Sequence, residues 1–335
     1  MIPDPSFLTV RDLYVQFKTE DGVVKAVDGL SFGLDRGRTL GIVGESGSGK
    51  SVTSMAVMGL HDPRYSEVSG EVWLDGENLL TATPRRMEAL RGRKVAMIFQ
   101  DSLSSLSPFH TVGSQIGEVL TKHTGASRRE ARERAIEMLA RVGIPQPKLR
   151  VDAYPHEFSG GMRQRAMIAM ALVCDPELVI ADEPTTALDV TVQAQILDLL
   201  KALQEETGSA IIMITHDLGV IADVADEVMV MYAGRAIERG TRREVLKAPG
   251  HPYTWGLLAS MPHLATDPDS PLRPVRGTPP SLLTLPSGCP FHPRCDYADR
   301  VPVDLCSTER PDLHPRTGHS SACYLSQTVK DQIRG

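Results

Sequence analysis

Short apolar runs alternate with helical patterns over much of the chain. The runs at 39–43, 94–99, 178–181, 210–214 and 228–231 have the length of buried strands. The segments that follow two of them, 52–60 and 190–206, have the length and apolar content of helices. Alternation of this kind predicts an α/β sheet that binds its ligand at the carboxyl ends of its strands.

Two regions depart from this alternation. Residues 7–34 contain short β-like pieces punctuated by glycines, and a hairpin is expected at 70–76, so we predict a small antiparallel sheet beside the core. Residues 112–143 favour helices. Ser127 with Glu130 three positions later forms a capping box at the start of one of them. We therefore expect a helical subdomain inserted between about residues 101 and 173.

The composition changes near residue 249. Residues 249–316 hold 14 of the 24 prolines, which excludes regular helix there and predicts a separate, loop-rich extension. We place the domains at 1–250 and 251–335. The remaining composition is ordinary. The net charge of −6 does not favour a nucleic-acid partner, no apolar run is long enough to cross a bilayer, and residues 1–5 do not start an export signal.

One stretch combines three glycines with a lysine and a serine at fixed spacing. Gly44-Glu45-Ser46-Gly47-Ser48-Gly49-Lys50-Ser51 follows the phosphate-binding pattern G-x-x-x-x-G-K-S, between an expected strand and an expected helix. The glycines allow a tight turn that aims backbone N–H groups at one point, and the helix N-terminus adds its positive dipole end. We expect Lys50 to reach the β- and γ-phosphates of a nucleotide and the Ser51 hydroxyl to bind Mg²⁺.

Two more stretches have the composition of nucleotide-binding elements. The run 178–181 ends in Asp182 and Glu183, at the carboxyl end of an expected strand. Asp182 is expected to hold Mg²⁺ through water and Glu183 to polarise an attacking water, the alternative being two surface acids. Ser159-Gly160-Gly161 precedes the apolar segment 167–173, which indicates either a second anion-binding helix N-terminus or an ordinary serine cap.

The ordered set of motifs resembles that of the ATP-binding-cassette (ABC) ATPases. Ser159-Gly160-Gly161-Met162-Arg163-Gln164 is similar to the LSGGQ signature of that family, with Phe158 and Met162 as departures. By the same resemblance Gln100 corresponds to the Q-loop glutamine, Ala187-Leu188-Asp189 to the D-loop, and His216 to the switch histidine. Phe17 falls where the family has its adenine-stacking aromatic, although Tyr14 competes for that role.

The resemblance implies a fold and a mechanism. The fold would be an α/β P-loop NTPase with a RecA-like core, an N-terminal antiparallel β-subdomain, an inserted helical subdomain and a loop-rich, cysteine-containing C-terminal extension. Two cassettes would pack head to tail, so that ATP on the 44–51 loop of one is covered by the Ser159–Met162 segment of the other. Catalysis would use Glu183, His216, Gln100 and Asp189, and Mg²⁺ would be held by Ser51, Gln100 and Asp182.

Three stretches resemble the oligopeptide and dipeptide importers in particular: 100–108, 154–161 and the His-Pro-Tyr segment 251–258, the last of which physical reasoning alone interprets as a helix start. This implies an ATPase subunit that powers peptide uptake at the cytoplasmic face of the cell membrane. Its partners would be a second ABC ATPase subunit, two transmembrane permease subunits docking near residues 101–118, and an extracytoplasmic solute-binding protein. One alternative is the same ATPase role with nickel or another small solute as the transported substrate. The others are a soluble non-transport ABC ATPase and a non-catalytic regulatory cassette.

Four of the five cysteines lie in or near the proline-rich segment, at Cys289, Cys295, Cys306 and Cys323. A reducing compartment disfavours disulfides, and zinc modules usually have closer cysteine pairs, whereas iron–sulfur clusters accept varied spacing. A further alternative is that the four thiols bind no metal. The family resemblance favours a [4Fe–4S] cluster on these four residues, with Zn²⁺ as the alternative. Cys174 is expected to be a buried core thiol.

Overall fold

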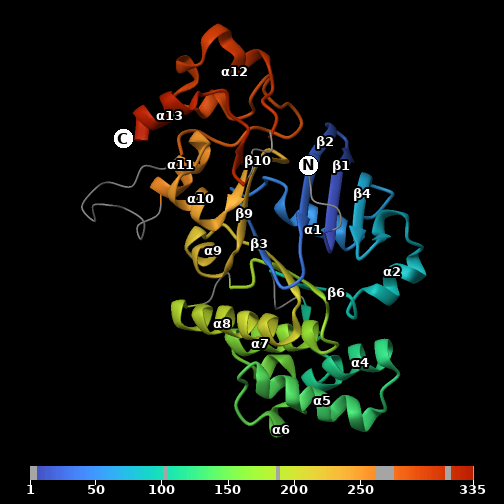
Figure 1. Ribbon diagram of the computed structural model, residues 1–335. Coiled ribbons are helices and arrows are strands. Elements are labelled where there is room, and N and C mark those ends of the chain that lie inside the picture. Colours follow the sequence, from blue (N-terminus) through green and yellow to red (C-terminus); the bar gives the residue numbers. More distant parts are fainter. Residues whose placement is uncertain (1–5, 101–104, 186–188, 261–274, 314–317, 335) are drawn as a thin grey trace. The chain divides into compact units, whose positions relative to one another are not determined.

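The computed structural model describes residues 6–100, 105–185, 189–260, 275–313 and 318–334. The backbone divides into two compact units. The first unit comprises residues 1–34, 40–80 and 215–335, and the second comprises 35–39 and 81–214 (Figure 1). The predicted domain boundary at residue 250 stays a prediction. No helix among the described residues is long and apolar enough to cross a membrane.

The first unit contains the antiparallel sheet that the N-terminal pattern predicts. Its strand order is β2-β1-β4-β5. The expected short pieces are in fact two long strands, because β-bulges carry the backbone through the polar interruptions. One of these bulges falls at Asp12, whose φ is 44°. The strands are β1 (Leu8–Thr19), β2 (Gly22–Leu34), β4 (Ser66–Leu74) and β5 (Glu77–Asn78).

The first unit also carries the strand and helix that flank the glycine-rich loop. β3 (Thr39–Val43), of which residues 40–43 belong to this unit, is fully buried and pairs in parallel with β9. β9 pairs antiparallel with β10, and β10 with β11. The other elements are α1 (Lys50–Val57), α9 (Leu218–Val224), β9 (Glu227–Tyr232), β10 (Arg235–Thr241), α10 (Arg242–Lys247), α11 (Pro252–Ala259), α12 (Leu305–Thr308), β11 (Ser320–Ser321) and α13 (Gln327–Arg334).

The described part of the second unit has three parallel strands. Most of the long helices also belong to this unit (Figure 1). The strands are β6 (Val95–Ile98), β7 (Leu178–Asp182) and β8 (Ala210–Ile214), in the order β8-β7-β6. The capping box of Ser127 and Glu130 is present at the start of α5, as predicted. The helices are α2 (Pro84–Leu90), α4 (Val112–Thr124), α5 (Arg128–Arg141), α6 (Pro147–Arg150), α7 (Gly160–Leu172) and α8 (Val190–Thr207).

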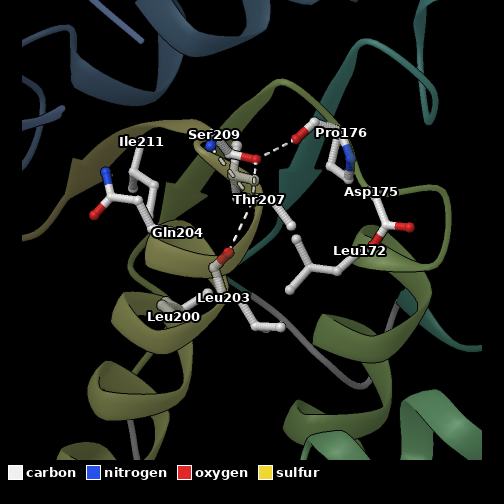
Figure 2. A pocket seen from close by; sticks show the side chains of 10 residues that line it. Leu172, Asp175, Pro176, Leu200, Leu203, Gln204, Thr207, Ser209 and Ile211 are labelled. Atoms are coloured by element: carbon white, nitrogen blue, oxygen red, sulfur yellow. Dashed lines mark hydrogen bonds between the residues drawn. The ribbon is translucent and has the colours of Figure 1, made fainter. Parts of the chain in front are cut away.

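A small apolar pocket shows how α8 is attached to β8. Leu172 of α7 and Leu200 and Leu203 of α8 line it (Figure 2). In the turn between α8 and β8, the Ser209 hydroxyl donates to the Pro176 carbonyl at 2.5 Å and lies 2.7 Å from the Thr207 hydroxyl. Because these polar groups are paired, the turn is fixed without leaving unsatisfied donors under the helix end.

Candidate functional site

The glycine-rich loop of the first unit lies between β3 and α1, as the sequence predicts. The Lys50 side chain folds back over this loop, where its ammonium donates to the Gly44 carbonyl at 2.8 Å and to the Glu45 carbonyl at 3.0 Å. Lys50 is only 6% exposed. The first residue of α1 therefore holds a cation against the loop at a helix N-terminus, which is an arrangement that attracts phosphate.

Glycine is required at two positions of the loop because other chain segments come very close. A Cβ atom at Gly44 would lie 2.3 Å from the Met231 carbonyl oxygen, and one at Gly49 would lie 2.4 Å from that of Ala26. Gly49 also has φ 101°, in the region that L-residues avoid. The loop is thus packed against its own unit on the outside, so its backbone is fixed before any ligand binds.

The surroundings of the Ser48 hydroxyl indicate a binding site, and they can be seen only in the structure. The Ser48 side chain is 4% exposed, and its buried hydroxyl oxygen has no hydrogen-bond partner among the residues that the structure describes. Leaving a buried hydroxyl unpaired costs about 1–3 kcal/mol. A phosphate oxygen in the loop would accept the missing hydrogen bond, so the residues present fit a nucleotide phosphate.

The predicted carboxylates lie in the second unit, at the end of β7. Asp182 ends the strand and is 4% exposed. Glu183 follows with φ 48°, a strained backbone for a glutamate, and its N–H donates to the Ile214 carbonyl at 2.8 Å. The Gln100 side-chain amide donates to the Glu183 carboxylate at 3.0 Å. Two residues predicted for the catalytic site, 83 positions apart, are therefore in contact.

The signature segment starts helix α7, as the sequence predicts. Ser159 is the N-cap, and its hydroxyl accepts the Met162 N–H at 3.3 Å. A Cβ atom at Gly160 would meet nothing within 4 Å, so the outer side of this helix end is open within the described residues. Sequence reasoning missed the role of Gln164, which is buried and donates to the Pro184 carbonyl at 2.6 Å. This bond ties α7 to the residue after Glu183.

Two other predicted site residues mark helix starts. Asp189 is the N-cap of α8, where its carboxylate accepts the Val192 N–H at 2.9 Å. His216 is exposed and directly precedes Asp217, the N-cap of α9. Parts of two predicted loops, 101–104 of the Q-loop and 187–188 of the D-loop, lie outside the described residues.

The two candidates for the adenine-stacking aromatic occupy different surroundings on β1. The Phe17 ring packs edge-on against His61 at 5.5 Å, and the His61 ring donates to the Val52 carbonyl of α1 at 2.8 Å. Tyr14 instead lines a polar cavity with Arg235 and Arg310. Phe17 therefore lies beside the helix that follows the glycine-rich loop, which supports its predicted role.

The four cysteines of the extension line one cavity, together with Phe291 and His251. All five cysteines of the chain are free thiols. Burial raises the pKa of Cys289 to about 12 and that of Cys295 to about 11. Neutral thiols at these positions would deprotonate only on binding a metal. Cys174 is partly exposed, so the prediction of a buried core thiol was wrong; it lies just beyond the end of α7.

The comparisons with known proteins agree with the motifs. The ABC transporter family model matches residues 27–186, and the model of the C-terminal region of oligopeptide/dipeptide transporters matches 237–301. The chain is 54% identical over 303 residues to the oligopeptide transport ATP-binding protein OppD of Bacillus subtilis, covering 90% of this chain and 84% of that one. It is 52% identical over 320 residues to the dipeptide transport ATP-binding protein DppD of the same organism, covering 95% and 94%.

The chain belongs to the oligopeptide/dipeptide family of ABC transporter ATP-binding proteins. Its predicted fold class is confirmed. A dimeric post-hydrolysis structure of the ATP-binding cassette MJ0796, bound to ADP and Pi, superimposes with a TM-score of 0.64 at 28% identity, covering 70% of this chain and 99% of that one. The cassette cbiO1 from Clostridium perfringens has a TM-score of 0.61 at 28% identity, covering 72% and 91%. Family membership also confirms the prediction of an ABC ATPase of a peptide importer.

Proposed function

We propose that this member of the family hydrolyses ATP on its 44–51 loop to power the uptake of di- or oligopeptides. The observation that carries the proposal is the state of that loop. A buried cation, Lys50, and the buried Ser48 hydroxyl, which is unpaired within the described part of the chain, both lie at a helix N-terminus. These groups are suited to binding the phosphates of a nucleotide.

Further residues would supply the chemistry of the proposed reaction. Glu183 would accept a proton from the attacking water, and its contact with Gln100 keeps the carboxylate oriented. Ser51, Gln100 and Asp182 would hold Mg²⁺, which neutralises phosphate charge when bound. His216 would contact the γ-phosphate. Asp189 would belong to the catalytic set at the boundary between the two cassettes.

A second cassette is part of the proposal. Ser159, Gly160, Gly161 and Met162 lie at the N-terminus of α7, which is built to bind an anion. We assign this helix end to ATP held on the loop of a partner cassette. The dimeric state of the MJ0796 cassette supports this arrangement. The partner here would be a related ATPase chain. Two permease subunits at the cytoplasmic face of the membrane and an extracytoplasmic solute-binding protein would complete the importer.

The Glu183→Gln variant of the assembled importer tests the catalytic assignment. We expect ATP to bind with unchanged affinity, while hydrolysis at this chain's site falls by about 100-fold or more because the proton acceptor is lost. Glu133→Gln, on the exposed face of α5, is the matched control and should hydrolyse ATP at the wild-type rate. Wild-type turnover in Glu183→Gln would remove Glu183 from its proposed role.

The thiol cavity is proposed to hold a [4Fe–4S] cluster. Four sulfurs around a single zinc would lie about 3.8 Å apart, given Zn–S bonds of about 2.3 Å. Among the described residues, no three metal-binding side chains come together closely enough to hold one ion, although all four thiols line the same cavity. A cluster gives each cysteine its own iron and so accepts wider spacing. Iron and sulfide analysis with a visible absorption spectrum decides between the cluster and a zinc ion. A colourless protein loaded with zinc would contradict the cluster.

A further inference from the structure

The second residue of the phosphate-binding loop makes an ion pair with the C-terminal extension. The Arg294 guanidinium binds both oxygens of the Glu45 carboxylate, with Nη1–Oε2 at 2.6 Å and Nη2–Oε1 at 2.9 Å. The Arg294 side chain is 6% exposed and that of Glu45 26%. A bidentate, largely buried pair of this kind is much stronger than an exposed ion pair and fixes the orientation of both groups.

The backbone of the same loop residue is held by a second group. The Glu45 N–H donates to the Tyr253 hydroxyl at 2.8 Å, and Tyr253 is 0% exposed. Tyr253 belongs to the His-Pro-Tyr segment, which starts helix α11 as physical reasoning from the sequence predicts. The extension therefore contacts both the main chain and the side chain of Glu45.

Arg294 also has partners other than Glu45, which hold its side chain in place. Its Nε donates to the Arg276 carbonyl at 2.7 Å, and its Nη1 lies 3.3 Å from the Tyr232 hydroxyl. The guanidinium also lies over the Tyr232 and Phe291 rings, at 5.8 and 5.9 Å from their centroids. An arginine with this many partners loses little freedom on pairing, so it acts as a rigid anchor.

We propose that Arg294 and Tyr253 are positioning residues for ATP binding, which hold and neutralise Glu45 so that its carboxylate does not oppose the nucleotide. The inference rests on the proposed nucleotide site. Glu45 lies next to the groups that would bind the triphosphate, and like charges at short range repel each other strongly in a partly buried site. With Arg294 in place, the loop presents no uncompensated negative charge from this residue.

The proposal is tested by a double-mutant cycle in the assembled importer, with fluorescent ATP-analogue binding and ATPase kinetics as readouts. Arg294→Met should raise the Kd and the KM for ATP about tenfold and leave kcat within about twofold, because the chemistry does not touch this residue. Glu45→Gln combined with Arg294→Met should recover to within about threefold of wild type, since a neutral side chain needs no cation. Tyr253→Phe keeps the ring and should raise the Kd several-fold through loss of the hydroxyl alone.

Controls separate this effect from a general loss of structure. Arg310→Met removes another arginine of the extension, which pairs at 2.7 Å with Asp28 rather than with Glu45, and should leave the Kd unchanged. The proposal is overturned if Arg294→Met binds ATP like wild type, or if the double variant is as weak as the single one. If Arg294→Met does not fold, Tyr253→Phe decides by the same Kd measurement. A wild-type importer that binds no ATP would instead refute the proposed function.

Discussion

Replacing Glu238 with glutamine tests how the start of the extension is attached to the cassette. Glu238 lies on β10 and is 0% exposed. One carboxylate oxygen accepts the Gly250 N–H at 2.5 Å and the His319 ring nitrogen at 2.7 Å. The other accepts the His251 N–H at 3.0 Å and the Thr254 hydroxyl at 2.6 Å. All four partners are donors, so the site requires two acceptor oxygens.

Glutamine has nearly the same shape but presents an NH₂ group where one oxygen was. Two of the four donors then face another donor, and each buried group left unpaired costs about 1–3 kcal/mol. Because the threonine hydroxyl can rotate and the histidine can change its tautomer, we expect a loss of about 2–4 kcal/mol in the local stability of α11 and β11.

Hydrogen exchange followed by mass spectrometry is the appropriate assay, because a chain with two compact units has no single unfolding free energy. A loss of 2 kcal/mol speeds exchange of the protected amides after residue 250 by about 30-fold. Glu227→Gln is the matched control on the neighbouring strand. It removes an ion pair with Arg239 in which Glu227 is 49% exposed, so we expect at most about 1 kcal/mol. Equal exchange rates in the two variants would refute the reasoning.

Three further results are expected. Burial lowers the pKa of His251 to about 3, below the unfolded value of about 6.5, so the unfolded chain binds the proton first as the pH falls. Local stability should therefore decline by about 1.4 kcal/mol per pH unit from pH 6.5 towards 3, and His251→Asn, which keeps an N-cap acceptor, should flatten this decline in pH-dependent exchange. Ser48→Ala should leave hydrogen exchange of the loop amides unchanged or slower and weaken ATP binding about tenfold, whereas an unchanged Kd would show that its hydroxyl does not meet phosphate. Gly49→Ala should abolish ATP binding, because its Cβ would collide with the Ala26 carbonyl, and measurable wild-type affinity would contradict this.

Elements with a strong local signal could be predicted from the sequence. The buried strands β3 and β8 have the predicted bounds because a short apolar run is buried on both faces and has sharp polar ends. The start of α5 follows from its capping box. β10 was missed because its sequence, Arg235–Thr241, is half polar and is stabilised by pairing with β9 rather than by its own pattern. The start of α7 follows from Ser159, which caps the helix, and from the two glycines after it.

The candidate site also has parts that the sequence predicts and parts that it does not. The loop at 44–51 is recognisable because all its chemistry lies within eight consecutive residues. The contact of Gln100 with Glu183 needed a family resemblance, since nothing local relates two positions 83 residues apart. Arg294 gave no signal, because an arginine in a proline-rich segment is ordinarily solvated. Its partner lies 249 residues away, and only the folded chain brings the two together.

The extension contacts the glycine-rich loop through Tyr253 and Arg294. Phe291 lines the thiol cavity, and its ring also packs against Tyr253 at 5.3 Å. Tyr253 in turn accepts the Glu45 N–H, and Arg294 precedes Cys295, another residue of the cavity wall. Whatever holds Cys289 and Cys295 also fixes the short segment between them, and that segment carries the guanidinium that pairs with Glu45. We expect a group bound by Cys289 and Cys295 to fix the 3-10 helix His292–Arg294 between them, which would give the cysteines a role at the phosphate-binding loop.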